Sequence, residues 1–175
     1  MTVKKILFII LCISIIFISC SEQDGCTDPI ATNYNPDAEQ DDGSCVFGII
    51  GIWKPDSVII HLLEQEYSLS GELLDSEEMF LTRPSENIGI SGNMQFTNDG
   101  IAIIGFLNNY IDTGTYIISG NNFSHYESDG DLGAEFIYSS SKTQLTLFRS
   151  MSETDNDYDG YDIYTREETL YLTKQ

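Results

Sequence analysis

The sequence is poor in basic residues. Its 175 residues include 8 Lys and Arg against 28 Asp and Glu, a formal net charge of −20. A surface with this charge repels phosphate backbones and anionic lipid headgroups, so the composition argues strongly against nucleic-acid binding. It attracts cations and basic partners, or it serves only to keep the protein soluble. Disorder is not implied, because 41% of the residues are hydrophobic and ten are tyrosines.

The residues that enzymes use as nucleophiles, bases and metal ligands are also scarce. Beyond residue 46 there is no cysteine, and the two histidines, His61 and His125, lie in unrelated segments. No glycine-rich phosphate loop, Gly-x-Ser-x-Gly motif or paired-histidine motif occurs. A single histidine within a strand is more often structural or solvent-facing than catalytic. We therefore expect a protein that is not an enzyme and requires no cofactor.

The first twenty residues contain a short apolar run and no acidic residue. Lys4 and Lys5 precede residues 6–18, a run too short to cross a hydrocarbon core of ~30 Å as a helix, which needs roughly 20 residues. This pattern is typical of a secretory signal peptide, here residues 1–19; an uncleaved short membrane anchor is the alternative. After cleavage 28 acidic and six basic residues remain, a net charge of about −22.

The end of the apolar run, "FISC" at residues 17–20, resembles the lipobox of bacterial lipoproteins. Phe17 departs from the usual leucine, and Cys12 is a weaker candidate because a bulky residue precedes it. The resemblance implies that Cys20 receives acyl chains and begins a tether over residues 20–24. Each buried methylene contributes about 0.8 kcal/mol to membrane binding, so two or three chains hold the protein firmly. The acidic "SEQD" that follows resembles a surface-export tag, which implies an outer-membrane location facing the cell exterior.

Two cysteines remain if Cys12 leaves with the signal peptide and Cys20 is acylated. Cys26 and Cys45 are then each other's obvious partners in an oxidising exported compartment. Closing this loop restricts the unfolded chain by roughly 3 kcal/mol in the chain-entropy description. The segment between them is too polar to fold by burial alone, so we expect a short disulfide-stapled loop.

The remainder of the chain, residues 47–175, has the length of one domain with one core. Turn signals separate short apolar runs, among them "TNDG" at 97–100 and "ETDNDYDG" at 153–160. Apolar residues alternate within the runs, as at Leu145 and Leu147, so one apolar row per strand can line a common interior. We therefore predict an all-β domain with an antiparallel meander.

Two segments of this domain have ambiguous patterns. Residues 63–91 fit one strand and a long loop, or a short helix around residues 73–80 that ends before Pro84. The run "DNDYDG" at 155–160 matches the first half of an EF-hand loop, but Arg166 stands where a bidentate glutamate should close the shell. We interpret that run as an acidic hairpin loop.

Several motifs of the domain follow one another as they do in lipocalins. "GIWKPDSV" at 51–58 resembles the Gly-x-Trp opening strand, and "MQFTNDG", "GTYIISGNNF", "TQLTLF" and "TLYLTK" follow in the family's order. The resemblance implies an up-and-down antiparallel barrel of about eight strands, which leaves no open sheet edge. It also implies that Trp53, next to Gly51 in the signature, packs across one end of the barrel. A basic residue of the last strand then covers it, and Arg166 is our candidate.

A barrel of this size is either filled by its own side chains or wide enough for one small apolar ligand. For the hollow case, the predicted lining residues are Phe96, Ile103, Tyr116, Phe136 and Leu147. The resemblance then implies a monomeric, lipid-anchored binding protein for a small hydrophobic or amphipathic ligand. The alternative is a structural lipoprotein with a filled barrel whose outer surface engages a surface protein or glycan.

The segment "GCTDPIATNYNPDAEQDDGSC" resembles a Cys/Asp-rich module of bacterial surface proteins whose usual form is close to "GCTDPTACNYDPNATEDDGSC". The resemblance spans residues 25–46, with Thr32 in place of the module's second cysteine. Its oxygen donors are numerous enough for Ca²⁺, which takes roughly 6–8 oxygens. The candidate ligands are Asp28, Asn33, Asn35, Asp37, Asp41 and Asp42. The alternative is that these side chains cap turns through local hydrogen bonds in a rigid spacer that holds no ion.

Overall fold

The computed structural model describes residues 23–90, 92–106 and 109–175. The predicted signal peptide and the acylation candidate Cys20 lie outside the described residues. The chain divides between Val46 and Phe47 into two compact units. Within the described ranges, no helix is long and apolar enough to cross a membrane.

The first unit is a loop with very little regular structure. Strand β1 (Asp24–Gly25) pairs in parallel with β2 (Gln40–Asp41). A disulfide joins Cys26 to Cys45, whose Cα atoms are 4.7 Å apart. Cys26 is only 1% exposed and Ala31 is 7% exposed, whereas Cys45 is half-buried. The predicted pairing of these two cysteines is confirmed.

The described part of the second unit contains nine strands and the short 3-10 helix η1. In chain order these are β3 (Gly51–Ser68), β4 (Leu73–Pro84), η1 (Ser85–Ile88), β5 (Met94–Phe96), β6 (Ile101–Gly105), β7 (Ile111–Ser119), β8 (Asn122–Tyr126), β9 (Leu132–Ser140), β10 (Gln144–Asn156) and β11 (Gly160–Lys174). All pairings between these strands are antiparallel.

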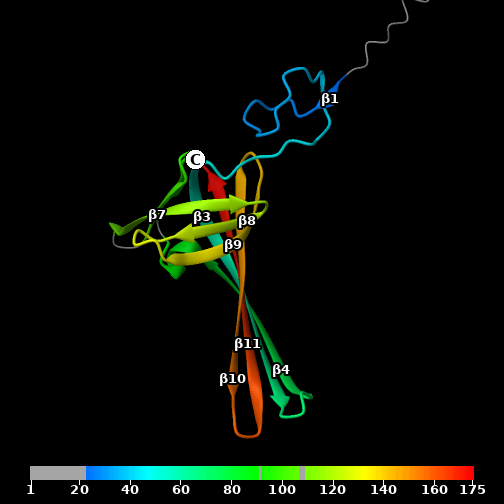
Figure 1. Ribbon diagram of the computed structural model, residues 1–175, viewed down its shortest axis with the longest axis vertical. Helices are drawn as coiled ribbons and strands as arrows, with labels where there is room; N and C mark the ends of the chain where they lie inside the picture. The colour runs from blue at the N-terminus through cyan, green and yellow to red at the C-terminus, as the bar shows by residue number, and fades with distance from the viewer. Residues whose placement is uncertain (1–22, 91, 107–108) are drawn as a thin grey trace, which may run out of the picture. The chain divides into compact units, whose positions relative to one another are not determined.

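Eight of the nine strands close into a barrel. Their order is β3, β5, β6, β7, β8, β9, β10 and β11, and β11 pairs again with β3 (Figure 1). From β5 onward each strand pairs with the next along the chain. This order is expected because short turns connect the alternating apolar runs. The prediction of an all-β antiparallel barrel of about eight strands is therefore confirmed.

The ninth strand, β4, occupies the segment that the sequence left ambiguous. A tight turn leads into it, in which the Ser68 amide donates a hydrogen bond to the Glu72 carbonyl at 2.9 Å. Gly71 adopts a φ of 82°, a conformation that favours glycine. From this turn β4 pairs with β3 along its whole length. The helix considered for residues 73–80 is wrong, because a hairpin partner lies directly beside these residues.

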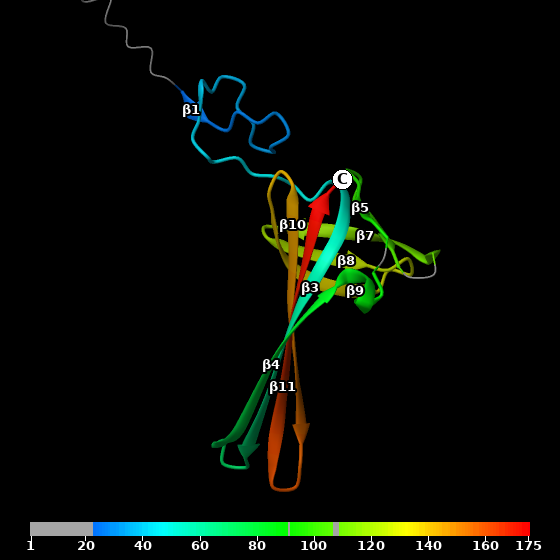
Figure 2. The same cartoon turned by 180° about the vertical axis from the view of Figure 1, so that it is seen from behind.

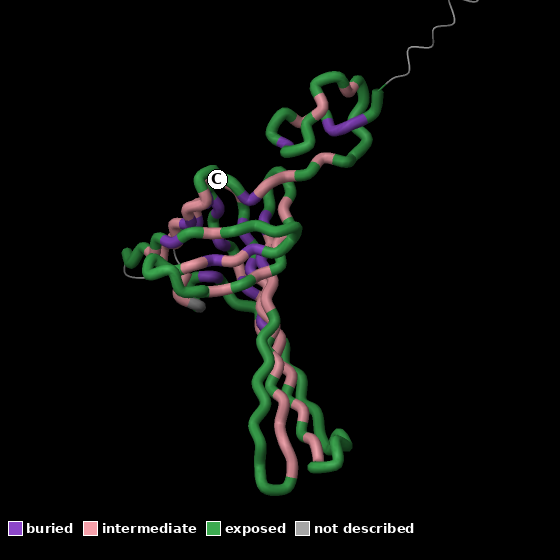
Figure 3. Tube along the Cα trace, viewed as in Figure 1, coloured by how far each residue is buried: buried purple, intermediate pink, exposed green. Residues whose placement is uncertain are grey.

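The long strands β3, β4, β10 and β11 continue beyond the barrel as a four-stranded sheet (Figures 1 and 2). We call this extension the arm and define it as residues 61–68, 73–80, 150–156 and 160–167. None of the arm's residues is buried, whereas the buried residues of this unit gather in the barrel and next to it (Figure 3). The arm is thus a single layer of sheet with no core of its own.

The most deeply buried side chains of the hydrophobic core lie at the end of the barrel that is remote from the arm. Ile49, Trp53, Leu145 and Leu172 are each at most 1% exposed. Burying a side chain of this size stabilises the fold by roughly 1.5–3 kcal/mol. This packed layer closes one end of the barrel, and the other end, next to the arm, is less tightly filled.

Candidate functional site

A cavity of about 370 Å³ lies inside the barrel, between the core and the arm. Its position follows along β10, where Leu145 and Leu147 belong to the core, Leu147 and Arg149 line the cavity, and Met151 belongs to the arm. Small-molecule sites usually measure about 300–1,000 Å³, so this cavity suits one small ligand. The apolar wall includes Val58, Met94, Phe96, Phe123, Leu147 and Leu170. The polar lining consists of Asp112, His125, Glu127, Arg149, Arg166 and Glu168.

One ring nitrogen of His125 has no partner on this wall. Strand residues alternate between two faces, so His125 shares the barrel interior with Phe123, and the two are 6% and 2% exposed. Its Nε2 atom is buried and finds no hydrogen-bond partner within the described part of the protein. A buried polar atom left unpaired costs about 1–3 kcal/mol. One ring nitrogen of a cavity-lining histidine is therefore left without a hydrogen bond within the described protein.

Two glycines bring neighbouring strands close to this imidazole. A Cβ atom on Gly114 of β7 would lie 2.8 Å from Nε2 of His125 and 2.0 Å from the carbonyl oxygen of Tyr126. A Cβ atom on Gly133 of β9 would lie 3.2 Å from Nδ1. Any larger residue at Gly114 would force the backbone apart. The ring is thus held between three strands, and its position is set before a ligand arrives.

Two arginines share one carboxylate at the arm end of the cavity. Glu168 accepts hydrogen bonds from Nε of Arg149 at 2.5 Å and from Nε of Arg166 at 2.8 Å. Burial disfavours the charged form of Glu168, but the bonds from Arg166 and Arg149 outweigh it and hold its pKa below the ordinary value. The Arg149 guanidinium also lies 5.5 Å from the ring centre of Phe136. The trio keeps one positive charge in excess.

The other end of the barrel carries the Gly-x-Trp signature. Trp53 is fully buried, and its Nε1 donates a hydrogen bond to the Ile49 carbonyl at 2.6 Å. Lys174 lies over the indole, with Nζ 5.2 Å from the ring centre. Gly51 adopts a φ of 139°, and a Cβ there would lie 3.0 Å from Cε of Lys174. The prediction that Arg166 covers Trp53 is wrong, because Arg166 pairs with Leu62 further along β3.

The predicted lining residues divide into two groups. Phe96, Phe136 and Leu147 line the cavity. The prediction is wrong for Ile103, which pairs with outward residues of β5 and β7, while its neighbour Ile104 faces the interior. Tyr116 is not on the cavity wall; it packs edge-on against Phe96 at 5.5 Å and donates its hydroxyl to the Thr97 carbonyl.

The polar half of the lining was not predicted from the sequence. His125 was expected to be only a structural or solvent-facing residue. The signal that would have found it is its alternation with Phe123 in "NNFSHY", which places both side chains on one face of a strand. Arg149 and Glu168 could not have been found in the same way. They are paired because β10 and β11 lie side by side in a particular register, and this register cannot be deduced from the sequence.

In the first unit, the candidate calcium ligands cap turns. Oδ1 atoms of Asp28, Asn35, Asp41 and Asp42 accept hydrogen bonds from backbone amides two residues further on, at 2.9–3.1 Å. The bonds from Ser44 hold the pKa of Asp42 below its ordinary value. Asn33 bonds the backbone at Ser44 and Val46, both at 2.7 Å. These bonds fit the rigid-spacer interpretation, and calcium binding, with Asp37 as a further ligand, stays a prediction.

Comparisons with known proteins do not assign the chain to a family. No protein-family model matches it, and no solved structure matches it. A stretch of 24 residues is 71% identical to ribulose bisphosphate carboxylase/oxygenase activase 1, chloroplastic, from Larrea tridentata. The match covers 14% of this chain and 5% of that protein, too little to indicate a shared fold or activity. The resemblances to lipocalins and to the surface module therefore remain predictions.

Proposed function

We propose that the chain is a binding protein whose barrel holds one small amphipathic ligand and which is anchored to the cell envelope through acylated Cys20. The observation that carries the ligand-binding part is the 370 Å³ cavity, whose lining includes His125, a residue with a buried and unpartnered Nε2 atom. The anchor and the surface location rest on the sequence of residues 1–24. No catalytic step is part of the proposal.

The cavity walls suggest how such a ligand lies. Its apolar part packs against the rings of Phe96, Phe123 and Phe136, which removes apolar surface from water. Its polar group exchanges a hydrogen bond with Nε2 of His125, which has no partner within the described protein. Because the ring is already fixed between Gly114 and Gly133, little ordering entropy is lost on binding.

The alternative, a solid barrel with a purely structural role, fits the closed end of the barrel but not the cavity. A filled barrel would place apolar side chains against His125 and leave its nitrogen permanently unpaired. In a binding protein, the same ring nitrogen forms a hydrogen bond with the ligand. We therefore favour the binding function for the barrel interior.

The experiment compares the two histidines of the chain. The full mature protein is titrated with the amphipathic probe anilinonaphthalene sulfonate, and its fluorescence gives Kd. His125→Leu, which removes both ring nitrogens at a similar side-chain volume, is expected to weaken binding about five- to tenfold, the effect of one lost hydrogen bond. His61→Leu is the matched control, because His61 lies outside the cavity lining, and it should change Kd less than about twofold.

Either of two results overturns the proposal. The first is wild-type protein that neither binds the probe nor retains a co-purifying small molecule in native mass spectrometry. The second is an equal loss of affinity in the two histidine variants, since the probe would then bind elsewhere.

A further inference from the structure

One face of the arm continues the barrel interior. Because strand side chains alternate, the residues that follow the cavity-lining positions of β10 and β11 at intervals of two lie on the same face. We call this the inner face of the arm. It consists of Leu62, Glu64, Glu66, Asp75, Glu77, Met79, Met151, Glu153, Asp155, Asp162, Tyr164 and Arg166. Nothing within the described protein covers it, although a sheet normally buries at least one face.

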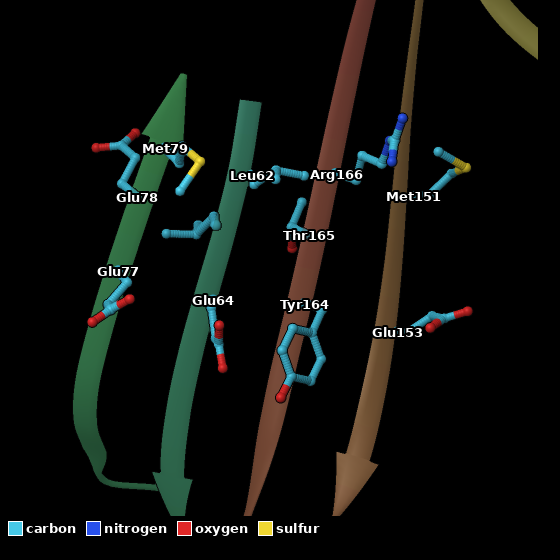
Figure 4. A pocket seen from close by; sticks show the side chains of 11 residues that line it. Leu62, Glu64, Glu77, Glu78, Met79, Met151, Glu153, Tyr164, Thr165 and Arg166 are labelled. Atoms are coloured by element: carbon cyan, nitrogen blue, oxygen red, sulfur yellow. The ribbon is translucent and has the colours of Figure 1, made fainter. Parts of the chain in front are cut away.

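An apolar groove of about 500 Å³ opens on this face. Figure 4 shows Met79, Leu62, Arg166 and Met151 in one row across the four strands, as the register requires. Met79 is 54% exposed and Met151 is 40% exposed. Methionine side chains adapt to partners of irregular shape and are common at binding surfaces. The groove thus offers apolar contact area that the fold itself does not use.

Carboxylates surround the groove on the side away from the barrel. The next row is Glu77, Glu64, Tyr164 and Glu153 (Figure 4), and the row after that is Asp75, Glu66, Asp162 and Asp155. Like charges placed directly opposite one another destabilise a sheet. Burial first, and then the charges of Glu64 and Asp162, raise the pKa of Tyr164 to about 12, so its hydroxyl stays neutral. The inner face therefore combines apolar surface with a concentrated negative charge.

Only one basic residue lies on this face, and it does not neutralise these rows. Arg166 is turned toward the barrel, where its guanidinium bonds Glu168. A second hollow of about 300 Å³ adjoins the rows, and Glu64, Glu66, Asp75 and Asp162 are among its lining residues. A partner that fits this surface must bring positive charge as well as apolar side chains.

We propose that the inner face of the arm docks an extended, basic segment of a partner polypeptide in which apolar side chains accompany lysine or arginine. The apolar side chains occupy the groove of Leu62, Met79 and Met151, and the basic side chains pair with the carboxylate rows. A second copy of this chain does not fit, because a molecule of net charge −20 presents the same carboxylates. This docking does not depend on a ligand in the barrel.

The test uses the full mature chain with its disulfide intact and a synthetic peptide of alternating lysine and leucine, followed by fluorescence anisotropy. The combined variant Glu64→Gln, Glu66→Gln, Asp162→Asn is expected to weaken binding about tenfold, the joint effect of three exposed charge contacts. The matched control neutralises three exposed carboxylates of the barrel unit: Glu86→Gln, Asp131→Asn and Glu135→Gln. It changes the net charge equally and is expected to alter affinity less than about twofold.

Further measurements distinguish the proposed basic, apolar peptide from other molecules that could bind the arm. Met79→Gln with Met151→Gln should weaken the lysine–leucine peptide but leave the binding of polylysine unchanged. Equal losses in the arm and barrel variants would overturn the proposal, since net charge alone would then attract the peptide. Cross-linking that joins two copies through the arm, or calcium binding that the arm variant abolishes while the peptide fails to bind, would overturn it as well.

Discussion

Strands β10 and β11 pass through both the barrel and the arm, and the same alternation of side chains has different results in the two regions. On β10, Leu145 and Leu147 are 1% and 2% exposed inside the barrel, but Met151 on the same face is 40% exposed in the arm. Leu170 and Tyr164 on β11 differ in the same way, at 6% and 40%. Strand geometry is continuous, whereas burial stops where the barrel ends.

The two regions are consequently stabilised by different interactions. The barrel gains roughly 1.5–3 kcal/mol from each large side chain that it buries. The arm relies on its backbone ladder and on cross-strand pairs such as Tyr67–Tyr161, whose ring centres are 5.1 Å apart. Each such pair contributes about 0.2–1 kcal/mol. Folding accounts for the buried residues of the barrel, whereas the exposed apolar and acidic residues of the arm contribute little to the stability of the fold.

Truncation of one side chain in each region should produce the largest difference. Phe96→Ala removes a ring that is 2% exposed and in contact with Phe123 at 5.4 Å, so we expect a loss of about 3–5 kcal/mol. Met79→Ala removes an exposed side chain and should change stability by less than about 0.5 kcal/mol. Urea unfolding measures both values. Similar losses would show that the arm has a core of its own.

A smaller difference is expected for two glycines that face the same steric problem. A Cβ on Gly114 would lie 2.0 Å from the Tyr126 carbonyl oxygen, and a Cβ on Gly160 would lie 2.1 Å from that of Tyr67. Gly114→Ala should destabilise the barrel by about 1–3 kcal/mol, because packed neighbours cannot move away. Gly160→Ala lies at the arm's uncovered tip, where the hairpin can shift, so its effect should be smaller. The opposite order in urea unfolding would contradict the comparison.

The features predicted correctly from the sequence are those that depend on neighbours along the chain. Alternation at Leu145 and Leu147 and the turn signals between apolar runs are local, and they were sufficient for an antiparallel meander, whereas closure into a barrel was implied by the lipocalin resemblance. The pairing of Cys26 with Cys45 followed from the exclusion of the other two cysteines. These are signals that a single strand or loop carries by itself.

The features that were missed depend on contacts between distant segments. In "IAIIGF" both faces of the strand are apolar, so alternation does not distinguish Ile103 from Ile104. The arm was not predicted because its existence depends on four strands that extend together past the barrel. Lys174, eight residues beyond Arg166, covers Trp53 because the register of β11 against β3 places it there.

The smallest expected effect concerns the protonation of His61, whose ring bonds residues of two neighbouring strands at the base of the arm. His61 of β3 bonds Glu167 of β11 at 3.1 Å and Glu78 of β4 at 2.7 Å, and it stacks on Phe80. The hydrogen bond to Glu167, followed by the one to Glu78, raises the pKa of His61 above 6.5. A raised pKa means that the stabilising contribution is complete below pH 6.5 and is lost as the pH rises through the folded-state pKa.

Hydrogen exchange should locate this effect in the arm alone. After correction for intrinsic exchange rates, amide protection in residues 61–68 and 160–167 should fall as the pH rises past the pKa of His61, while that of β8 and β9 stays constant. Glu167→Gln should lower the His61 pKa measured by NMR more than Glu78→Gln does, because the Glu167 bond is the larger cause. If protection fell equally in the barrel, protonated His61 would stabilise the whole sheet. That result would contradict the conclusion that barrel and arm are stabilised by different interactions.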